Sequence, residues 1–178
     1  MKESFREMTV NYLKTLIPFF STLLLVLICF VPTHIPLSHF LRPDVGLACV
    51  YFWVLYHRDV FGLAALALLG IIVDTLSGTP LGVHIAVFVF VYLMTIYFGN
   101  LVNTKPFIVS WTGFAGVCLM ALFIKGGILS LYHSKTVPIL YVLMTYLATV
   151  LIYPLITKFN IFLYDKYLFD DEAIYEQG

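Results

Sequence analysis

Long apolar runs follow one another along most of this chain, separated by short polar or proline-containing breaks. The six runs cover residues 13–31, 45–56, 60–77, 81–98, 107–124 and 137–157. At about 1.5 Å per helical residue, most of them match a hydrocarbon core of about 30 Å. Only 11% of the 178 residues are charged, whereas soluble domains carry about 25%. The sequence therefore predicts an all-α polytopic membrane protein with about six transmembrane helices.

The distribution of basic residues predicts the orientation of these spans. With the N-terminus inside, the cytoplasmic segments contain Lys2, Arg6, Lys14, Arg58, Lys105, Lys158 and Lys166, against Arg42, Lys125 and Lys135 outside. This excess favours two cytoplasmic termini. We expect a cytoplasmic segment 1–12, a membrane domain 13–157 and an acidic cytoplasmic tail 158–178.

The second run, 45–56, gives only about 18 Å of helix. A span that short must use flanking residues, thin the bilayer or be shielded by other helices. Short helices interrupted by glycine or proline also build binding sites in membrane proteins. The ends of the second and third spans stay open between these interpretations.

Ionisable residues stand at marked places around the second and third runs. Pro43 and Asp44 are typical of a helix start, and Asp74 falls in the last turn of the third run. A charge in that place needs a partner, and Arg42 is the candidate at the same depth. The alternative is that Arg42 reaches the headgroups while Asp74 lies in water. His84 is close enough in sequence to hydrogen-bond Asp74.

Turn and helix-breaking residues divide the second half of the chain. Gly78 is placed like a C-terminal helix cap, Thr79 like an N-cap and Pro80 like a first-turn proline. The run Lys125-Gly126-Gly127 predicts a break in the fifth span. Pro154 predicts a kink or an end in the sixth.

No catalytic motif is present, and the three cysteines lack metal-ligand spacing. Ten basic and ten acidic residues cancel, which gives no electrostatic basis for binding nucleic acid. We therefore expect neither an enzyme nor a metal or cofactor site. A proton-coupled transporter subunit using Asp74 would need a second buried ionisable group, and the sequence alone indicates none.

Residues 42–82 resemble the signature of the rod shape-determining protein MreD family. The shared pattern is Arg42-Pro43-Asp44, then Gly62, then Gly70 with Asp74, then Gly78 followed by Leu81-Gly82. The site candidates that this resemblance implies are Arg42, Pro43, Asp44, Gly70, Asp74, Gly78 and Gly82. His84 joins them by position, where the family more usually has a small residue.

The resemblance implies a non-catalytic scaffold in the bacterial cytoplasmic (inner) membrane. Expected partners are MreC, MreB, RodA with its penicillin-binding partner, and membrane lipids, and a homodimer is an open alternative. The implied fold is similar to the S components of energy-coupling-factor transporters. The second interpretation is accordingly a vitamin-binding subunit of such a transporter, which would require an outward cavity with convergent polar groups.

Overall fold

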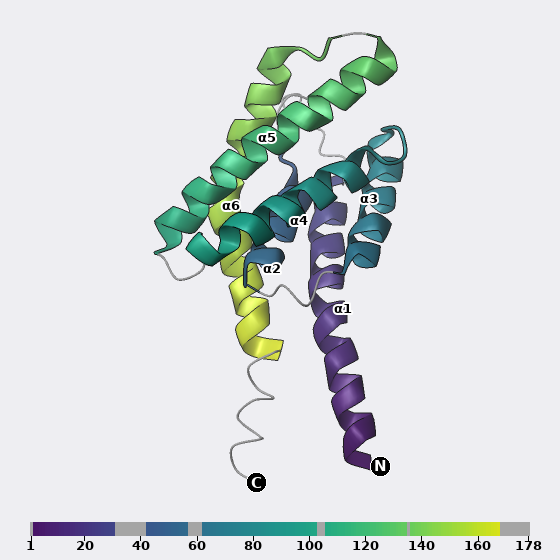
Figure 1. The fold of residues 1–178 in the computed structure, drawn as a ribbon, viewed down its shortest axis with the longest axis vertical. Coiled ribbons are helices and arrows are strands. Elements are labelled where there is room, and N and C mark those ends of the chain that lie inside the picture. The colour runs from purple at the N-terminus through teal and green to yellow at the C-terminus, as the bar shows by residue number, and fades with distance from the viewer. Residues whose placement is uncertain (1, 31–41, 57–61, 103–105, 135, 168–178) are drawn as a thin grey trace.

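The computed structural model describes residues 2–30, 42–56, 62–102, 106–134 and 136–167, and these are helical apart from short turns and helix flanks. The helices are α1 (Lys2–Phe30), α2 (Val45–Tyr56), α3 (Leu63–Ser77), α4 (Val83–Val102), α5 (Phe107–His133) and α6 (Ile139–Tyr167) (Figure 1). The all-α prediction is confirmed. Within these described residues, two helices, 107–133 and 139–164, are long and apolar enough to cross a membrane, and in each an apolar stretch of 18 residues is only 28% buried. This architecture is consistent with a helical membrane protein.

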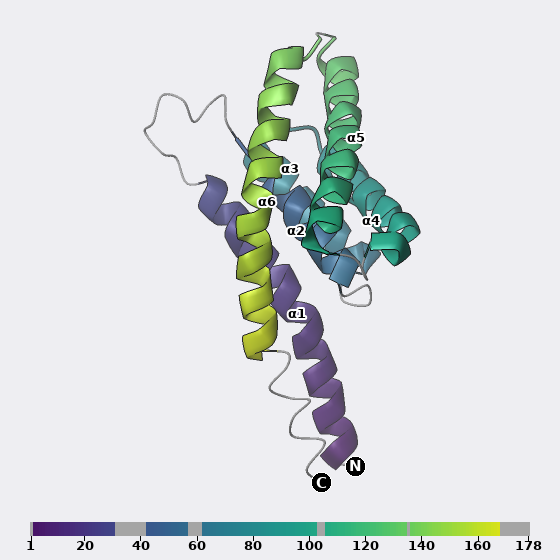
Figure 2. The ribbon, with the colours of Figure 1, turned by 90° about the vertical axis from the view of Figure 1, so that its left-hand side faces the viewer.

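Helix α2 forms the centre of the bundle. Every residue from Val45 to Leu55 is buried, and α1, α4, α5 and α6 all contact this helix. Figure 2 shows α5 and α6 side by side, with the start of α1 and the end of α6 directed toward the same end. The short second run is therefore a helix shielded by its neighbours, one of the three solutions expected for its length.

Three helices, α1, α5 and α6, are longer than their apolar runs by more than five residues. α1 begins at Lys2 because residues 2–12 contain no glycine or proline, and charged residues limit a membrane span but not a helix. α5 continues through Lys125–Gly127, so the predicted break is wrong. Lys125 can lie within this helix because its ammonium has a carboxylate partner in the bundle. α6 continues past Pro154 into the predicted tail, of which residues 168–178 lie outside the described residues.

The backbones of α3 and α4 approach each other closely at Gly70. A Cβ atom on Gly70 would lie 2.7 Å from the backbone nitrogen of Ile85, which leaves no room for any side chain. α3 then ends at Gly78, whose φ of 66° is the left-handed conformation predicted for a C-terminal cap. Gly82, with φ of 106°, completes the turn into α4. These glycines bring the end of α3 against the start of α4.

Candidate functional site

The Asp74 carboxylate lies at the α3–α4 turn with no exposed surface. Its Oδ1 accepts hydrogen bonds from the Thr79 hydroxyl at 2.8 Å, the His84 backbone N–H at 3.1 Å and the His84 Nδ1 at 2.6 Å. Its Oδ2 accepts a hydrogen bond from the Gly82 backbone N–H at 2.7 Å. Each carboxylate oxygen is thus satisfied by groups from the turn and the first residues of α4.

Asp74 stabilises the N-terminus of α4, although it belongs to the last turn of α3. Backbone N–H groups at a helix N-terminus lack partners within the helix and attract negative charge. The predicted N-cap role of Thr79 is wrong, because α4 begins at Val83 and the Thr79 hydroxyl binds Asp74 instead. The hypothesis of an Arg42–Asp74 pair is also wrong, and so is the alternative of a hydrated Asp74, since its oxygens are buried and bound within the turn.

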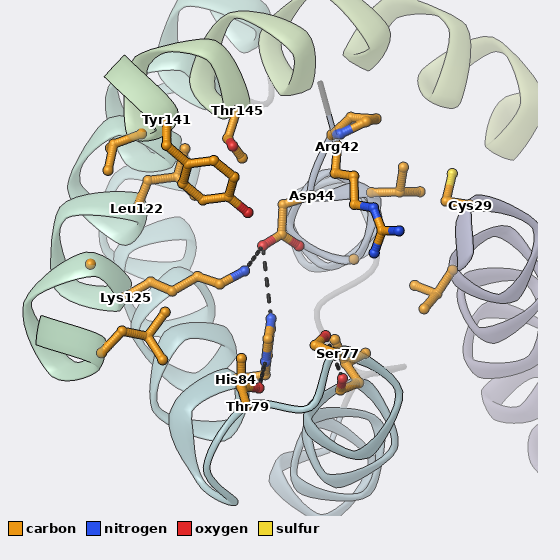
Figure 3. A pocket seen from close by; sticks show the side chains of 18 of the residues that line it. Cys29, Arg42, Asp44, Ser77, Thr79, His84, Leu122, Lys125, Tyr141 and Thr145 are labelled. Carbon is orange, nitrogen blue, oxygen red and sulfur yellow. Dashed lines mark hydrogen bonds and ion pairs between the residues drawn. The ribbon is translucent and has the colours of Figure 1, made fainter. Parts of the chain in front are cut away.

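A second carboxylate, Asp44, lies directly before α2 and joins three further helices. Its Oδ2 is 2.7 Å from the Lys125 Nζ on α5, and its backbone N–H donates to the Thr149 hydroxyl on α6 at 2.9 Å. The Nε2 of His84 lies 4.0 Å from the same Oδ2 (Figure 3). Asp44 therefore lies at the helix start that the sequence predicts. The sequence did not predict its partners on α4, α5 and α6.

Lys125, Asp44, His84 and Asp74 form a continuous chain of ionisable groups, which we call the polar cluster. It connects α5, the start of α2, the start of α4 and the end of α3. The expectation that Asp74 has no buried ionisable neighbour is therefore wrong. Lys125 was missed because the glycines after it predicted a loop. The apolar residues that follow, from Ile128 to Tyr132, were the signal that the helix continues.

The remaining candidates lie around the same cluster. Gly70, Gly78 and Gly82 shape the α3–α4 turn, and Pro43 is half-buried directly before Asp44. Arg42 is exposed and has no ion pair with any residue that the structure describes. The fold therefore gathers the two separate parts of the candidate set, residues 42–44 and 70–84, at one place.

A cavity of about 180 Å³ lies on one side of the polar cluster (Figure 3). Its polar lining comes from the segment before α2, the α3–α4 turn, the start of α4, α5 and α6, and includes Arg42, Asp44, Thr79, His84, Lys125, Tyr141 and Thr145. Its apolar lining includes Val26, Phe30, Leu122, Leu129, Val137 and Val142. This combination of a few polar groups on an apolar wall is typical of a ligand site.

Chemically, the polar cluster sets two carboxylates, Asp44 and Asp74, against the Lys125 ammonium and the His84 imidazole. Within the described ranges, no group of three His, Cys, Asp or Glu side chains is placed to hold a metal. Comparison with protein-family models, with curated proteins and with solved structures gives no match. The resemblance of residues 42–82 to a family pattern stays a prediction from the sequence.

Proposed function

We propose that this chain is a non-catalytic scaffold of the bacterial cell-elongation complex, which holds MreC and links it to lateral peptidoglycan synthesis and rod shape. In this proposal the helices span the cytoplasmic membrane six times, with both termini in the cytoplasm and a fold similar to that of the S components. One observation carries the proposal: Asp44 and Asp74, from separate parts of the MreD-like pattern, both lie within 4.0 Å of His84.

Paired and buried charges are suited to bracing helices against one another. Removing one partner from a buried pair leaves an uncompensated charge, so such a pair fixes the helices that provide it. The polar cluster fixes α2, α3, α4 and α5 in this way. A braced bundle presents constant surfaces to its partners, which is what a scaffold requires.

The surfaces offered to a partner are apolar faces of α5 and α6. Exposed large side chains there include Met120, Phe123, Leu131, Leu140, Leu147, Leu151 and Leu155. Helices in lipid associate by packing and a few polar contacts. We propose that the membrane span of MreC packs on these faces, and that MreB, RodA and its penicillin-binding partner join through the same complex.

The test is purification of the tagged chain from native membranes, with quantification of the proteins that follow it. Arg42→Gln and Asp74→Asn are compared with Thr75→Ala, whose exposed hydroxyl bonds only within α3, at equal amounts of inserted chain. We expect MreC with the wild type and with Thr75→Ala, and less of it with Arg42→Gln and with Asp74→Asn. A wild-type chain that recovers no MreC refutes the proposal.

A second candidate is a small-molecule binding subunit of an energy-coupling-factor transporter. The polar and apolar lining of the cavity supports this candidate, but the volume of the cavity does not. Its volume of about 180 Å³ is below the roughly 300–1,000 Å³ of sites that enclose a drug-sized ligand. The scaffold is for this reason the first proposal. Recovery of an ATPase module and a bound vitamin in the same purification would favour the transporter subunit.

A further inference from the structure

The lining of the cavity has two cationic side chains and several hydroxyl groups but one carboxylate. Arg42, Lys125, Tyr141 and Thr145 all carry N–H or O–H groups, and Asp44 is the carboxylate that faces them. Asp44 already binds the Lys125 ammonium at 2.7 Å. Since Asp44 compensates Lys125, one positive charge, that of Arg42, is left over in the lining.

The sequence next to Arg42 and between the last two helices adds no negative charge. Residues 31–41 and 134–138 contain no Asp or Glu. Asp74, the other carboxylate nearby, is fully buried and bound by the α3–α4 turn. Arg42 is exposed at the edge of the cavity and has no carboxylate partner among the described residues, so its guanidinium can bind an anion from outside the chain.

Thr145 gives an independent indication of a ligand. Its side-chain oxygen is buried and has no hydrogen-bond partner, and the residue is only 6% exposed. Figure 3 shows Thr145 and Tyr141 directed into the cavity from α6, with Lys125 and Arg42 on opposite sides of Asp44. A buried hydroxyl without a partner is destabilising, so this hydroxyl is suited to binding a group inside the cavity.

We propose that the cavity binds a phosphate group with one negative charge, of the kind found in a phospholipid headgroup, through Arg42, Tyr141 and Thr145. A tetrahedral phosphate offers oxygens in several directions and suits donors that surround it, and Arg binds it in bidentate fashion. A phosphodiester carries one negative charge and so matches the charge of Arg42. The volume, slightly above the roughly 150 Å³ that encloses benzene, holds a headgroup fragment while acyl chains stay outside.

The test uses the full chain in dodecyl maltoside, a detergent without phosphate. Native mass spectrometry measures binding of dioleoylphosphatidylglycerol, with dioleoylglycerol as the probe that lacks phosphate, and calorimetry measures binding of inorganic phosphate. We expect Arg42→Gln to weaken binding about tenfold, as for loss of a charged hydrogen bond. Thr145→Val should weaken it several-fold. Arg42→Lys should keep part of the affinity, and Lys158→Gln, an exposed cation elsewhere on α6, should leave it unchanged.

The two probes distinguish the sources of the phosphate. Tight, Arg42-dependent binding of the lipid with weak binding of inorganic phosphate supports a headgroup site. Equal or tighter Arg42-dependent binding of inorganic phosphate supports a site for a soluble phosphate. If dioleoylglycerol binds as well as the phospholipid, or if Arg42→Gln and Thr145→Val bind as tightly as the wild type, the proposal is wrong.

Discussion

Replacement of Asp74 by alanine should be among the most destabilising changes in this chain. It removes the acceptor of four hydrogen bonds and leaves the Gly82 and His84 backbone N–H groups and the Thr79 hydroxyl without their partner. Breaking a buried charged pair costs about 3–5 kcal/mol. At about 2–4 °C per kcal/mol for a chain of this length, the expected decrease in Tm is roughly 6–20 °C.

Asp74→Asn should have a smaller effect, because its amide oxygen can take the place of Oδ1. That oxygen accepts three of the four hydrogen bonds. The amide nitrogen then faces the Gly82 N–H, where a donor meets a donor. We expect about half the decrease in Tm seen for alanine.

The cysteines provide the assay. Cys49 and Cys118 are buried and Cys29 is exposed, so in a Cys29→Ser background a thiol-reactive dye reports unfolding in detergent. Thr75→Ala is the control, since it loses one exposed hydrogen bond within its own helix. A Tm for Asp74→Ala equal to that of the control would refute the reasoning that the carboxylate holds α3 and α4 together.

Two further substitutions test packing and pairing in the same assay. Gly70→Ala should lower the free energy of unfolding by about 1–3 kcal/mol, because the added Cβ meets the α4 backbone. Gly116→Ala is the control and should be neutral or stabilising, because nothing lies within 4 Å of its Cβ. Equal Tm values for the two variants would contradict the close approach of α3 and α4. Lys125→Met should cost about 3–5 kcal/mol by leaving Asp44 buried and unpaired, and adding Asp44→Asn should restore much of the loss. A double variant no more stable than Lys125→Met would show that the pair is not the cause.

Local signals predicted the positions of the helices and several of their ends. The Pro43-Asp44 start of α2 and the Gly78 end of α3 were predictable because each depends on the backbone conformation of neighbouring residues. The membrane-like composition likewise predicted an all-helical chain. These features require no knowledge of which helices touch.

The partners within the polar cluster could not be predicted in the same way. Lys125 and Asp44 are 81 residues apart, so their pairing depends on how α5 packs beside α2. Asp74 takes the capping role expected of Thr79 because its carboxylate reaches the backbone N–H groups of Gly82 and His84 across the α3–α4 turn. Arg42 was assigned a partner by depth alone, and depth does not give direction around the bundle.

The complete burial of α2 has a consequence for the synthesis of the protein. The Asp44 backbone N–H donates a hydrogen bond to Thr149 on α6, 105 residues later in the chain. Its carboxylate pairs with Lys125 on α5, which is also synthesised later. A ribosome working at about 5–20 residues per second completes those helices several seconds after α2 emerges. During that interval α2 is short and flanked by an unpaired charge. A nascent chain that stops before α5 should be a substrate for membrane proteases, because its second helix lacks the contacts with α5 and α6 and the Lys125 partner of Asp44.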